Sequence, residues 1–449
     1  MISQNSTIFP ITLGCPKNRV DTEVMLGLLT EAGCTISNDP DNADILLVNT
    51  CGFIQPAVEE AIDTIMDLIA VKKRHPGMSL VVTGCLVQRY GRSLRKELPE
   101  VDLFIGTDGF QDIVDHINGL PKKEVPVHAP APVYVMDSLT PRRLTTPAHR
   151  AYIKITEGCS NKCAYCMIPS IRGPLRSRSL DDIGTEVREL DSLNLKELTL
   201  VGQDLTAYGI DFGGSGPRLE NLLEHILGQS SIPWIRLLYL YPGRLSDPLL
   251  EIMAQEERIL NYLDIPLQHI SEKVLKNMRR PFGKKHLHTL IERIRTKVPD
   301  AAIRTTFMVG FPGETDEDVE EIADFLRQYK LHNVGVFTYS NEEGCAAEHL
   351  TDQIDEQVKQ RRADYLMEIQ SQISTQINQG YVGQRLEVLV EGVSQETELL
   401  LEGRSRFQAP EIDGCVYIAE GKCNSGELVT VEITEAHPYD LVGSIVSER

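Results

Sequence analysis

Three short apolar stretches in the first hundred residues each end in a cysteine, at Cys15, Cys51 and Cys85. The intervals of 36 and 34 residues match the length of a strand–helix–strand unit, and the intervening segments around 20–32 and 56–74 have the apolar spacing of helices. Repeated units of this kind predict an open sheet of parallel strands. Because the carboxyl ends of such strands share one edge, we expect the three cysteines to converge into a site with three thiolates.

A second set of three cysteines lies within eight consecutive positions, in the sequence EGCSNKCAYCMIP at 157–169. Cys159, Cys163 and Cys166 are separated by three and then two residues. A structural zinc site needs four ligands, and no second pair of cysteines or histidines follows at the usual spacing. An iron–sulfur cluster held by only three cysteines keeps one iron free for another ligand. The spacing therefore favours a four-iron cluster over zinc.

Six strand-like runs with helical patterns between them follow the second cysteine set. Six strand–helix units are fewer than the eight of a closed barrel, so they predict an open, partial (β/α)6 TIM-like barrel. Its site should lie at the C-terminal ends of the strands. The runs cover residues 151–155, 197–201, 234–240, 260–266, 301–309 and 333–338.

Two changes of pattern divide the chain into parts. A stretch with six prolines at 120–149 predicts an extended connector, and a helical segment from 356 ends at Gly380, after which only short strands are expected. The helix carries Leu366, Ile369, Ile373 and Ile377 on one face. We therefore predict an α/β multidomain protein: a parallel α/β sheet domain (1–135), a linker (136–147), the barrel with its linking helix (148–379) and a small antiparallel β-barrel (380–449).

Composition and charge narrow the class of protein. The opening segment lacks the charged start and apolar run of a signal peptide, and no stretch of eighteen apolar residues occurs, so we expect a cytoplasmic protein without membrane contact. Ten cysteines in a reducing compartment indicate metal ligation or catalysis rather than disulfides. The formal net charge of −20 disfavours nonspecific binding to nucleic acid and favours a basic protein partner.

The CxxxCxxC motif, with Tyr165 before its last cysteine, resembles the signature of the radical S-adenosylmethionine enzymes. This resemblance implies that the open iron chelates S-adenosylmethionine and that an electron from the cluster cleaves it to a 5′-deoxyadenosyl radical. The strand ends VGQD, PLQH and GFPGET resemble the segments with which such barrels line the cofactor, although they can also be ordinary glycine-containing turns. The contacts that the resemblance implies are Tyr165, Gly202, Gln203, Gln268, Gly310 and Gly313.

A three-cysteine site ahead of such a barrel resembles the methylthiotransferases, and this resemblance covers nearly the whole chain. It implies two 4Fe-4S clusters, one on Cys15, Cys51 and Cys85 and one on the CxxxCxxC cysteines, and a C-terminal barrel of the TRAM type. One S-adenosylmethionine would methylate a sulfur on the first cluster, and a second would supply the radical. No catalytic residue beyond the cluster ligands is implied. A protein such as flavodoxin or ferredoxin would be the reductant. The remaining cysteines, Cys34, Cys345, Cys415 and Cys423, are interpreted as structural.

Two local sequences indicate the target. LGCPKNRVDTE around Cys15 and GRSRFQAPEIDGCVYI at 403–418 resemble the RimO type of the family, which modifies an aspartate of the twelfth small-subunit ribosomal protein. Gln408 departs from the aspartate usual there. Residues 380–449 carry a net charge of −8, which would attract a basic ribosomal protein and repel RNA. The alternatives are a methylthiotransferase for transfer-RNA adenosine and a non-enzymatic iron–sulfur sensor or carrier.

Overall fold

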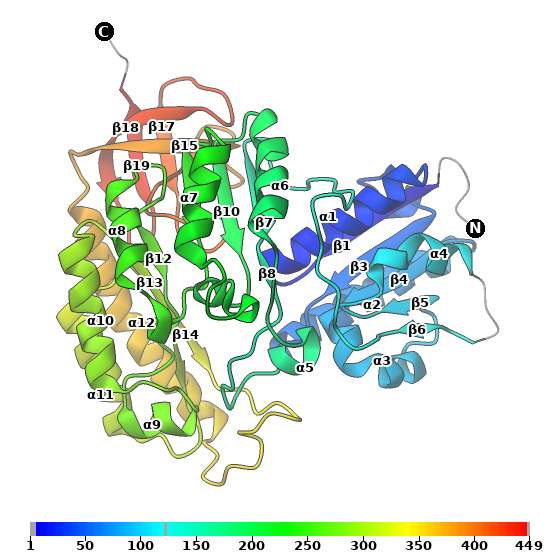
Figure 1. Ribbon diagram of the computed structural model, residues 1–449, viewed down its shortest axis with the longest axis horizontal. Helices are drawn as coiled ribbons and strands as arrows, with labels where there is room; N and C mark the ends of the chain where they lie inside the picture. The colour runs from blue at the N-terminus through cyan, green and yellow to red at the C-terminus, as the bar shows by residue number, and fades with distance from the viewer. Residues whose placement is uncertain (1–5, 121–123, 447–449) are drawn as a thin grey trace.

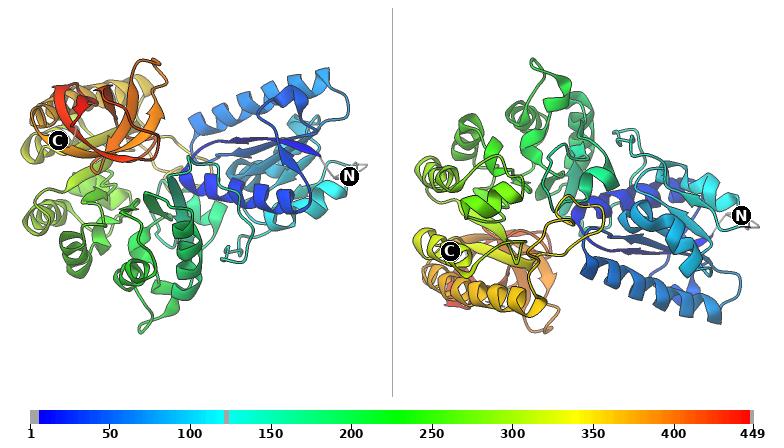
Figure 2. Two further views of the ribbon diagram at one scale, coloured as in Figure 1. Left: turned by 90° about the horizontal axis from the view of Figure 1, so that it is seen from above. Right: turned by 90° about the horizontal axis from the view of Figure 1, so that it is seen from below.

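The computed structural model describes residues 6–120 and 124–446 and has three parts, each built around its own sheet (Figure 1). The N-terminal sheet domain (blue to cyan) lies beside the central barrel (green to yellow), and the C-terminal barrel (orange to red) covers one end of the central barrel. Figure 2 shows the same arrangement from above and below. Within the described residues, no helix combines the length and the apolar character needed to cross a membrane.

The N-terminal domain is a six-stranded sheet in which every neighbouring pair of strands is parallel, as predicted. Its order is β2-β1-β3-β4-β5-β6, so the connections leave β1 in opposite directions and create a crevice at the carboxyl ends of β1 and β3. The strands are β1 (Thr7–Thr12), β2 (Thr35–Ile36), β3 (Ile45–Thr50), β4 (Ser79–Gly84), β5 (Leu103–Ile105) and β6 (Val127–His128).

Helices cover both faces of this sheet. On β3, Ile45 and Leu47 belong to the apolar layer that contains α1 (Pro16–Glu31) and α4 (Ile113–Asn118). Leu46 and Val48 belong to the opposite layer with α2 (Gln55–Arg74) and α3 (Cys85–Glu97). A continuous apolar run is therefore required in this strand, because successive side chains face opposite layers and both are buried.

The central part is the expected open barrel of six parallel strands, with one strand in each predicted run. Two three-stranded sheets, β11-β10-β7 and β12-β13-β14, are joined by a bridge between Ile235 and Ile259. The strands are β7 (Arg150–Lys154), β10 (Glu197–Val201), β11 (Trp234–Leu237), β12 (Tyr262–Asp264), β13 (Ala302–Val309) and β14 (Asn333–Thr338). Two short strands, β8 (Thr156–Glu157) and β9 (Arg176–Ser177), and helix α5 (Ile168–Arg172) follow β7.

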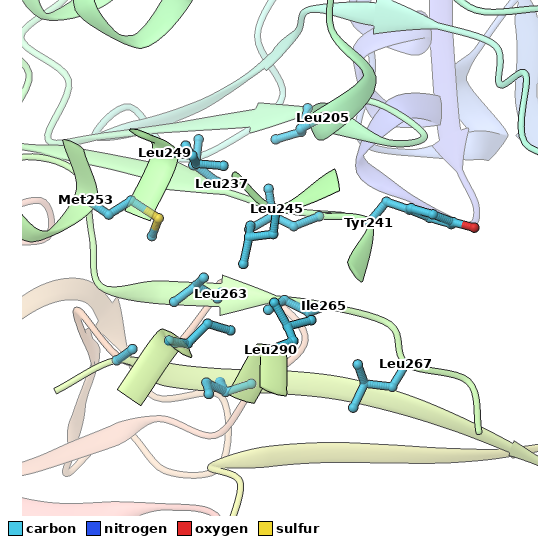
Figure 3. Close-up of a cluster of buried hydrophobic side chains, with 14 of the residues drawn as sticks. Leu205, Leu237, Tyr241, Leu245, Leu249, Met253, Leu263, Ile265, Leu267 and Leu290 are labelled. Carbon is cyan, nitrogen blue, oxygen red and sulfur yellow. The ribbon is translucent and has the colours of Figure 1, made fainter. Parts of the chain in front are cut away.

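The outer helices supply the other half of the barrel core. Figure 3 shows Leu237 and Leu263 of the strands facing Leu249 and Met253 of α8 and Leu290 of α10. The helices are α6 (Leu180–Ser192), α7 (Leu219–Gln229), α8 (Asp247–Gln255), α9 (Glu272–Asn277), α10 (Lys284–Lys297), α11 (Asp316–Tyr329) and α12 (Glu356–Gln379). The predicted apolar face of α12 packs on this core and the helix ends before Gly380.

The segment 129–149, which contains no helix or strand, is fastened to both domains that it connects. Arg142 forms ion pairs of 2.6 Å with Glu23 of α1 and with Glu186 of α6. The backbone N–H of Thr145 also donates to Glu23. Gly27 of α1 leaves the space in which the backbone of Pro141 lies. Residues 129–149 of the proline-rich stretch therefore form an ordered strap rather than a free spacer.

The C-terminal part is the predicted small β-barrel; it is closed by five strands, and its β17–β19 pair is parallel rather than antiparallel. The order is β15-β16-β17-β19-β18, from β15 (Arg385–Val393), β16 (Leu401–Ser405), β17 (Val416–Glu420), β18 (Leu428–Ala436) and β19 (Leu441–Ile445). The barrel is anchored on β10, where buried Glu197 forms 2.5 Å ion pairs with Arg236 and Arg404. These carboxylate contacts lower the pKa of Glu197 to about 2 despite its burial.

Candidate functional site

The loop that carries Cys159, Cys163 and Cys166 is held in one conformation by backbone contacts. It begins after β8 at Gly158, where φ is 71° and a Cβ would collide with the carbonyl oxygen of Pro174. The N–H of Cys159 donates to the carbonyl of Gly173 at 3.0 Å. The N–H of Ala164 donates to the carbonyl of Met278 at 3.0 Å. The three thiols therefore lie in a fixed loop between β8 and α5.

A cavity of about 340 Å³ opens beside this loop and is lined by all three parts of the chain. The three loop cysteines, Tyr165, Gln203 and Gln268 belong to the barrel. Phe53 comes from the segment after Cys51 in the N-terminal domain, and Ile412 comes from the C-terminal barrel. The polar side chains Asn161, Asp264, Arg280 and Arg304 also face it. A cavity of this size with few polar groups among apolar walls is typical of a small-molecule site.

The structure brings only part of the predicted contact set to this cavity. Tyr165, Gln203 and Gln268 line it, and Gln268, in the loop after β12, has a φ of 73°. Gly202 lies against Thr156, and Gly310 lies against the Lys359 side chain, where a Cβ would collide in each case. Gly313 lines a separate surface hollow with Lys273 and Asp352. The glycines therefore shape the strand ends, while the glutamines face the cavity.

Cys15, Cys51 and Cys85 lie at the carboxyl ends of the adjacent strands β1, β3 and β4, where the sequence predicts them. A Cβ on Gly14 would lie 2.8 Å from the Cβ of Cys51, so the first two cysteine loops touch. The side chain of Asn18 donates to the carbonyls of Leu13 and Thr50 and lies 3.7 Å from the Cys85 sulfur. Asn18 therefore connects all three strand ends.

Each set of three cysteines has the number of thiols that a four-iron cluster with one open iron would take. Among the described residues, no three His, Cys, Asp or Glu side chains are placed to hold one metal ion together. In a four-iron cluster each thiolate binds a different iron, so its ligands lie farther apart than those of a single ion. Three thiols at each site would leave one iron of such a cluster open.

A buried network of charges connects the two cysteine sites. Arg172 at the end of α5 lies 2.9 Å from Asp21, 3.2 Å from Glu157 and 3.6 Å from the sulfur of Cys85. Lys154 also pairs with Asp21 and with Glu157, the latter at 2.7 Å. Glu157 directly precedes the barrel cysteine loop. The two sites are therefore positioned relative to one another by paired charges that water does not reach.

The N-terminal site contains a second buried cation, Lys17. Its Nζ lies 3.5 Å from the ring centroid of Tyr239, which lines the cavity. Burial alone would raise the pKa of the Cys15 thiol, but the charges of Lys17 and Arg172 outweigh it and hold that pKa below the ordinary value. Burial raises the pKa of Cys51, and raises that of Cys85 to about 12. Cys15 is therefore the readiest thiolate of this site.

The barrel site has its own cation, Arg280. Its Nη1 lies 3.6 Å from the sulfur of Cys163, and its guanidinium stacks on Tyr241 with 4.5 Å between group and ring centroid. Burial raises the pKa of Cys159, and raises that of Cys166 to about 12. A nearby fixed positive charge favours the thiolates that bind iron and offsets the negative charge of a reduced cluster.

Sequence reasoning did not identify Lys17, Arg172 or Arg280. Lys17 follows Cys15 by two residues, and this proximity was the available signal. Arg172 and Arg280 are far from their cysteines in the sequence and reach them only in the folded protein.

The four remaining cysteines are not among the cavity-lining residues, and Cys345 is buried with Cys85, Met167 and Ile171 in one small cluster. Gln408 is buried and accepts from the N–H and hydroxyl of Ser405, so its side chain stabilises a turn.

Three family descriptions match the chain in the order of its three parts. They are "Uncharacterized protein family UPF0004" at residues 7–106, "Radical SAM superfamily" at 153–326 and "TRAM domain" at 382–446. Among solved structures, the radical S-adenosylmethionine methyltransferase TsrM from Kitasatospora setae has a TM-score of 0.57 at 13% identity, over 74% of this chain and 72% of that one. This likeness concerns the fold.

Curated relatives match over almost their whole length. "Ribosomal protein uS12 methylthiotransferase RimO" of Desulfotalea psychrophila is 52% identical over 97% of this chain and 98% of its own. The proteins of the same name from Anaeromyxobacter sp. and Myxococcus xanthus are 48% and 47% identical, over 97% and 98% of this chain and 92% of each of theirs. The agreement extends through all three parts, and the chain belongs to the RimO family of radical S-adenosylmethionine methylthiotransferases.

Proposed function

We propose that this enzyme adds a methylthio group to the β-carbon of an aspartate in the twelfth small-subunit ribosomal protein, uS12. The main support for this proposal is the cavity, which is lined by the barrel cysteines, by Phe53 two residues after Cys51 and by Ile412 of the C-terminal barrel. A sulfur atom held at the N-terminal site and a radical generated at the barrel site can meet a target only where the two sites face a common space. The names of the relatives supply the identity of the target.

The chain uses two 4Fe-4S clusters and S-adenosylmethionine, as its family does. We propose Cys159, Cys163 and Cys166 as ligands of the cluster in the barrel, and Cys15, Cys51 and Cys85 as ligands of the second. When bound, the first cluster and S-adenosylmethionine supply the carbon radical, and the second cluster supplies the sulfur. The donor sets fit this role because each offers three thiols beside a buried cation.

The polar residues of the cavity have a binding role in this proposal. Tyr165, Gln203 and Gln268 would contact S-adenosylmethionine, since they stand beside the cysteines on the cavity wall. Phe53 and Ile412 would exclude water above the target side chain. A radical is required because the β-carbon of an aspartate has no useful acidity, and general base catalysis gives only modest acceleration there. The protein thus supplies placement and a dry space, while the difficult chemistry belongs to the bound groups.

The acidic C-terminal barrel would recruit the basic ribosomal protein, and we do not expect it to bind RNA. Residues 380–449 carry five Lys or Arg against thirteen Asp or Glu. Glu396 and Glu398 are exposed and Glu402 is half-buried on this barrel. We also propose that the enzyme acts in the cytoplasm, accepts electrons from a flavodoxin or ferredoxin, and is divided into domains as predicted from the sequence, with boundaries near 135, 147 and 380.

The decisive experiment compares the two target classes directly. The reconstituted protein is incubated without oxygen with S-adenosylmethionine, a sulfide source and dithionite, once with purified uS12 and once with transfer RNA. We expect a methylthio group on an aspartate of uS12 and none on RNA, by mass spectrometry of both products. The group on an adenosine alone would overturn the proposed target and leave the family assignment intact.

A charge-reversal variant tests recruitment. Glu396→Lys, Glu398→Lys and Glu402→Lys together should weaken uS12 binding and slow its modification, while cleavage of S-adenosylmethionine without uS12 stays normal. Glu60→Lys, Asp63→Lys and Asp67→Lys together change the net charge by the same amount on α2, outside this barrel, and provide the control. Unchanged uS12 binding in the variant with three Glu→Lys changes would show that the acidic surface does not recognise uS12.

A further inference from the structure

A basic segment stands out on this acidic protein. Residues 273–285 contain six Lys or Arg and no Asp or Glu, whereas the whole chain has a net charge of −20. The segment runs from α9 through a turn into the start of α10, and the backbone N–H of Lys284 donates to Glu272, which closes it into a compact unit. Lys273, Lys276, Arg279, Lys284 and Lys285 are exposed, and together with exposed Lys162 they form what we call the basic patch.

Most cations of the basic patch form no ion pair, in contrast to those of the basic run 72–74. In the run 72–74, Lys72 pairs with Asp102, Lys73 with Glu100 and Arg74 with Asp41. In the basic patch, Lys284 pairs with Glu321 at 3.0 Å. Within residues 6–120 and 124–446, no acidic side chain forms an ion pair with Lys162, Lys276, Arg279 or Lys285. Four cations therefore face solvent with their charge uncompensated.

The basic patch lies directly over the barrel cysteine loop. Lys162 lies between two of the loop cysteines, and the N–H of Ala164 donates to the carbonyl of Met278 at the end of α9. The following residue, Arg279, has a φ of 57°. This turn exposes Arg279 to solvent and directs Arg280 inward to the sulfur of Cys163. In Figure 1, α9 and α5 lie toward the same lower end of the molecule.

We propose that the basic patch is the docking surface for an acidic protein that carries one electron at a time. The carrier is oxidised by one electron, and the cluster held by Cys159, Cys163 and Cys166 is reduced by one electron; no bond in either protein forms or breaks. Lys162 of the patch belongs to the cysteine loop itself, and α9 contacts that loop through the hydrogen bond from Ala164 to Met278, so a carrier seated there delivers its electron over a short path. The proposal rests on the proposed function, because only reductive cleavage of S-adenosylmethionine requires this electron.

Charge decides between the possible occupants. The ribosomal protein is basic and would be repelled by the patch, whereas it suits the acidic C-terminal barrel. An acidic carrier is attracted by the unpaired cations and steered toward the cluster, and it would be repelled by most of the remaining surface. The molecule thus presents surfaces of opposite sign to the protein that it modifies and to the protein that reduces it.

The test uses the reconstituted holoenzyme and a purified acidic flavodoxin. The variant Lys276→Glu, Arg279→Glu, Lys285→Glu is compared with the triple variant Arg92→Glu, Lys96→Glu, Lys422→Glu. The second variant has the same net charge but changes exposed cations outside the patch that form no ion pair with any described residue. The Kd for flavodoxin, from calorimetry without oxygen, should rise at least about tenfold in the first variant only. The difference should shrink at high salt, because exposed charges are screened within about 8 Å at physiological ionic strength.

Kinetics give the second readout. Reduction of the cluster by reduced flavodoxin should slow in parallel with the weaker binding, whereas reduction by dithionite and dithionite-driven cleavage of S-adenosylmethionine should match wild type. The neutral variant Lys276→Gln, Arg279→Gln, Lys285→Gln should give an intermediate Kd. Equal Kd values for both charge-reversal variants would overturn the proposal, as would loss of affinity for a ribosomal RNA fragment without loss for flavodoxin. Dithionite-driven modification of uS12 tests the proposed function independently of either result.

Discussion

The two cysteine sites present the same three thiols but are assembled in opposite ways. The barrel site is a single loop, in which Cys159 and Cys166 are seven positions apart and backbone hydrogen bonds set the conformation. The N-terminal site takes one cysteine from each of three strands, over seventy residues, and depends on the whole sheet for its geometry. The barrel site should therefore tolerate damage elsewhere in the fold, whereas the N-terminal site should be sensitive to the packing of its sheet and to Arg172.

The largest expected effect separates the tasks of the two sites. Replacing Cys159, Cys163 and Cys166 with alanine should remove half of the iron and abolish formation of 5′-deoxyadenosine. Replacing Cys15, Cys51 and Cys85 should also remove half of the iron, but cleavage of S-adenosylmethionine should persist while methylthio transfer is lost. Iron analysis measures the cluster content of each variant, and chromatography measures the 5′-deoxyadenosine that it forms. Retention of all iron in either variant, or normal methylthio transfer in the second, would contradict the division of labour.

The next effect concerns the network that connects the sites. Arg172→Met removes the cation between Asp21 and Glu157, and breaking such a buried pair costs about 3–5 kcal/mol. The urea midpoint of the metal-free protein should fall, and iron should be lost from the N-terminal site before the barrel site. Arg178→Met is the matched control, because Arg178 is equally buried against Asp182 and Glu186 and contacts no cysteine in the described structure. A midpoint unchanged by Arg172→Met would refute the structural role of the network.

A smaller effect should appear in the reduction potential of the barrel cluster. The Arg280 guanidinium beside Cys163 stabilises the more negative, reduced cluster, so Arg280→Gln should lower the potential by about 60 mV, the equivalent of a tenfold change for a one-electron couple. Redox titration followed by electron paramagnetic resonance measures it without flavodoxin. Arg279→Gln removes an exposed charge one residue away and should change the potential much less. Equal shifts in both variants would show that contact with the sulfur is unimportant.

The smallest effect is a pH dependence of the N-terminal thiols. In metal-free protein the lowered pKa of Cys15 makes it thiolate at a lower pH than Cys51 or Cys85, so iodoacetamide should label it first as pH rises. Lys17→Met removes one of the charges responsible, so the labelling curve of Cys15 should move to higher pH and its rate at pH 7 should fall severalfold. Mass spectrometry of the labelled peptides measures this, with Lys73→Met as control. A labelling curve of Cys15 that moves to lower pH in Lys17→Met would contradict this prediction.

The barrel cysteine motif and the six strand runs were predictable because both are local patterns, and the convergence of Cys15, Cys51 and Cys85 followed from parallel strand order. Two of the cations that serve the sites, Arg172 and Arg280, were not predictable. Arg172 and Cys85 are 87 positions apart, and Arg280 and Cys163 are 117 apart, so no spacing rule connects them. The strands after Gly380 were predicted only as a group; the strand pattern is weakest at β16 and β19, which are short and contain Gly403 and Gly443. Gly313 was assigned to the cofactor by position alone, and the structure places it at a separate hollow.

The strap around Pro141 also has a consequence for biosynthesis. Arg142 needs a carboxylate from α1, made before it, and another from α6, made about forty residues later. While the chain is still being synthesised, the N-terminal sheet can form but its last fastening must wait until α6 has emerged. Proteases often cut proline-rich linkers between domains. This linker is held to both domains once α6 docks, because Arg142 then pairs with Glu23 and Glu186. The two iron-binding halves should therefore mature together, and a chain truncated before α6 should be recognised and degraded as unfinished.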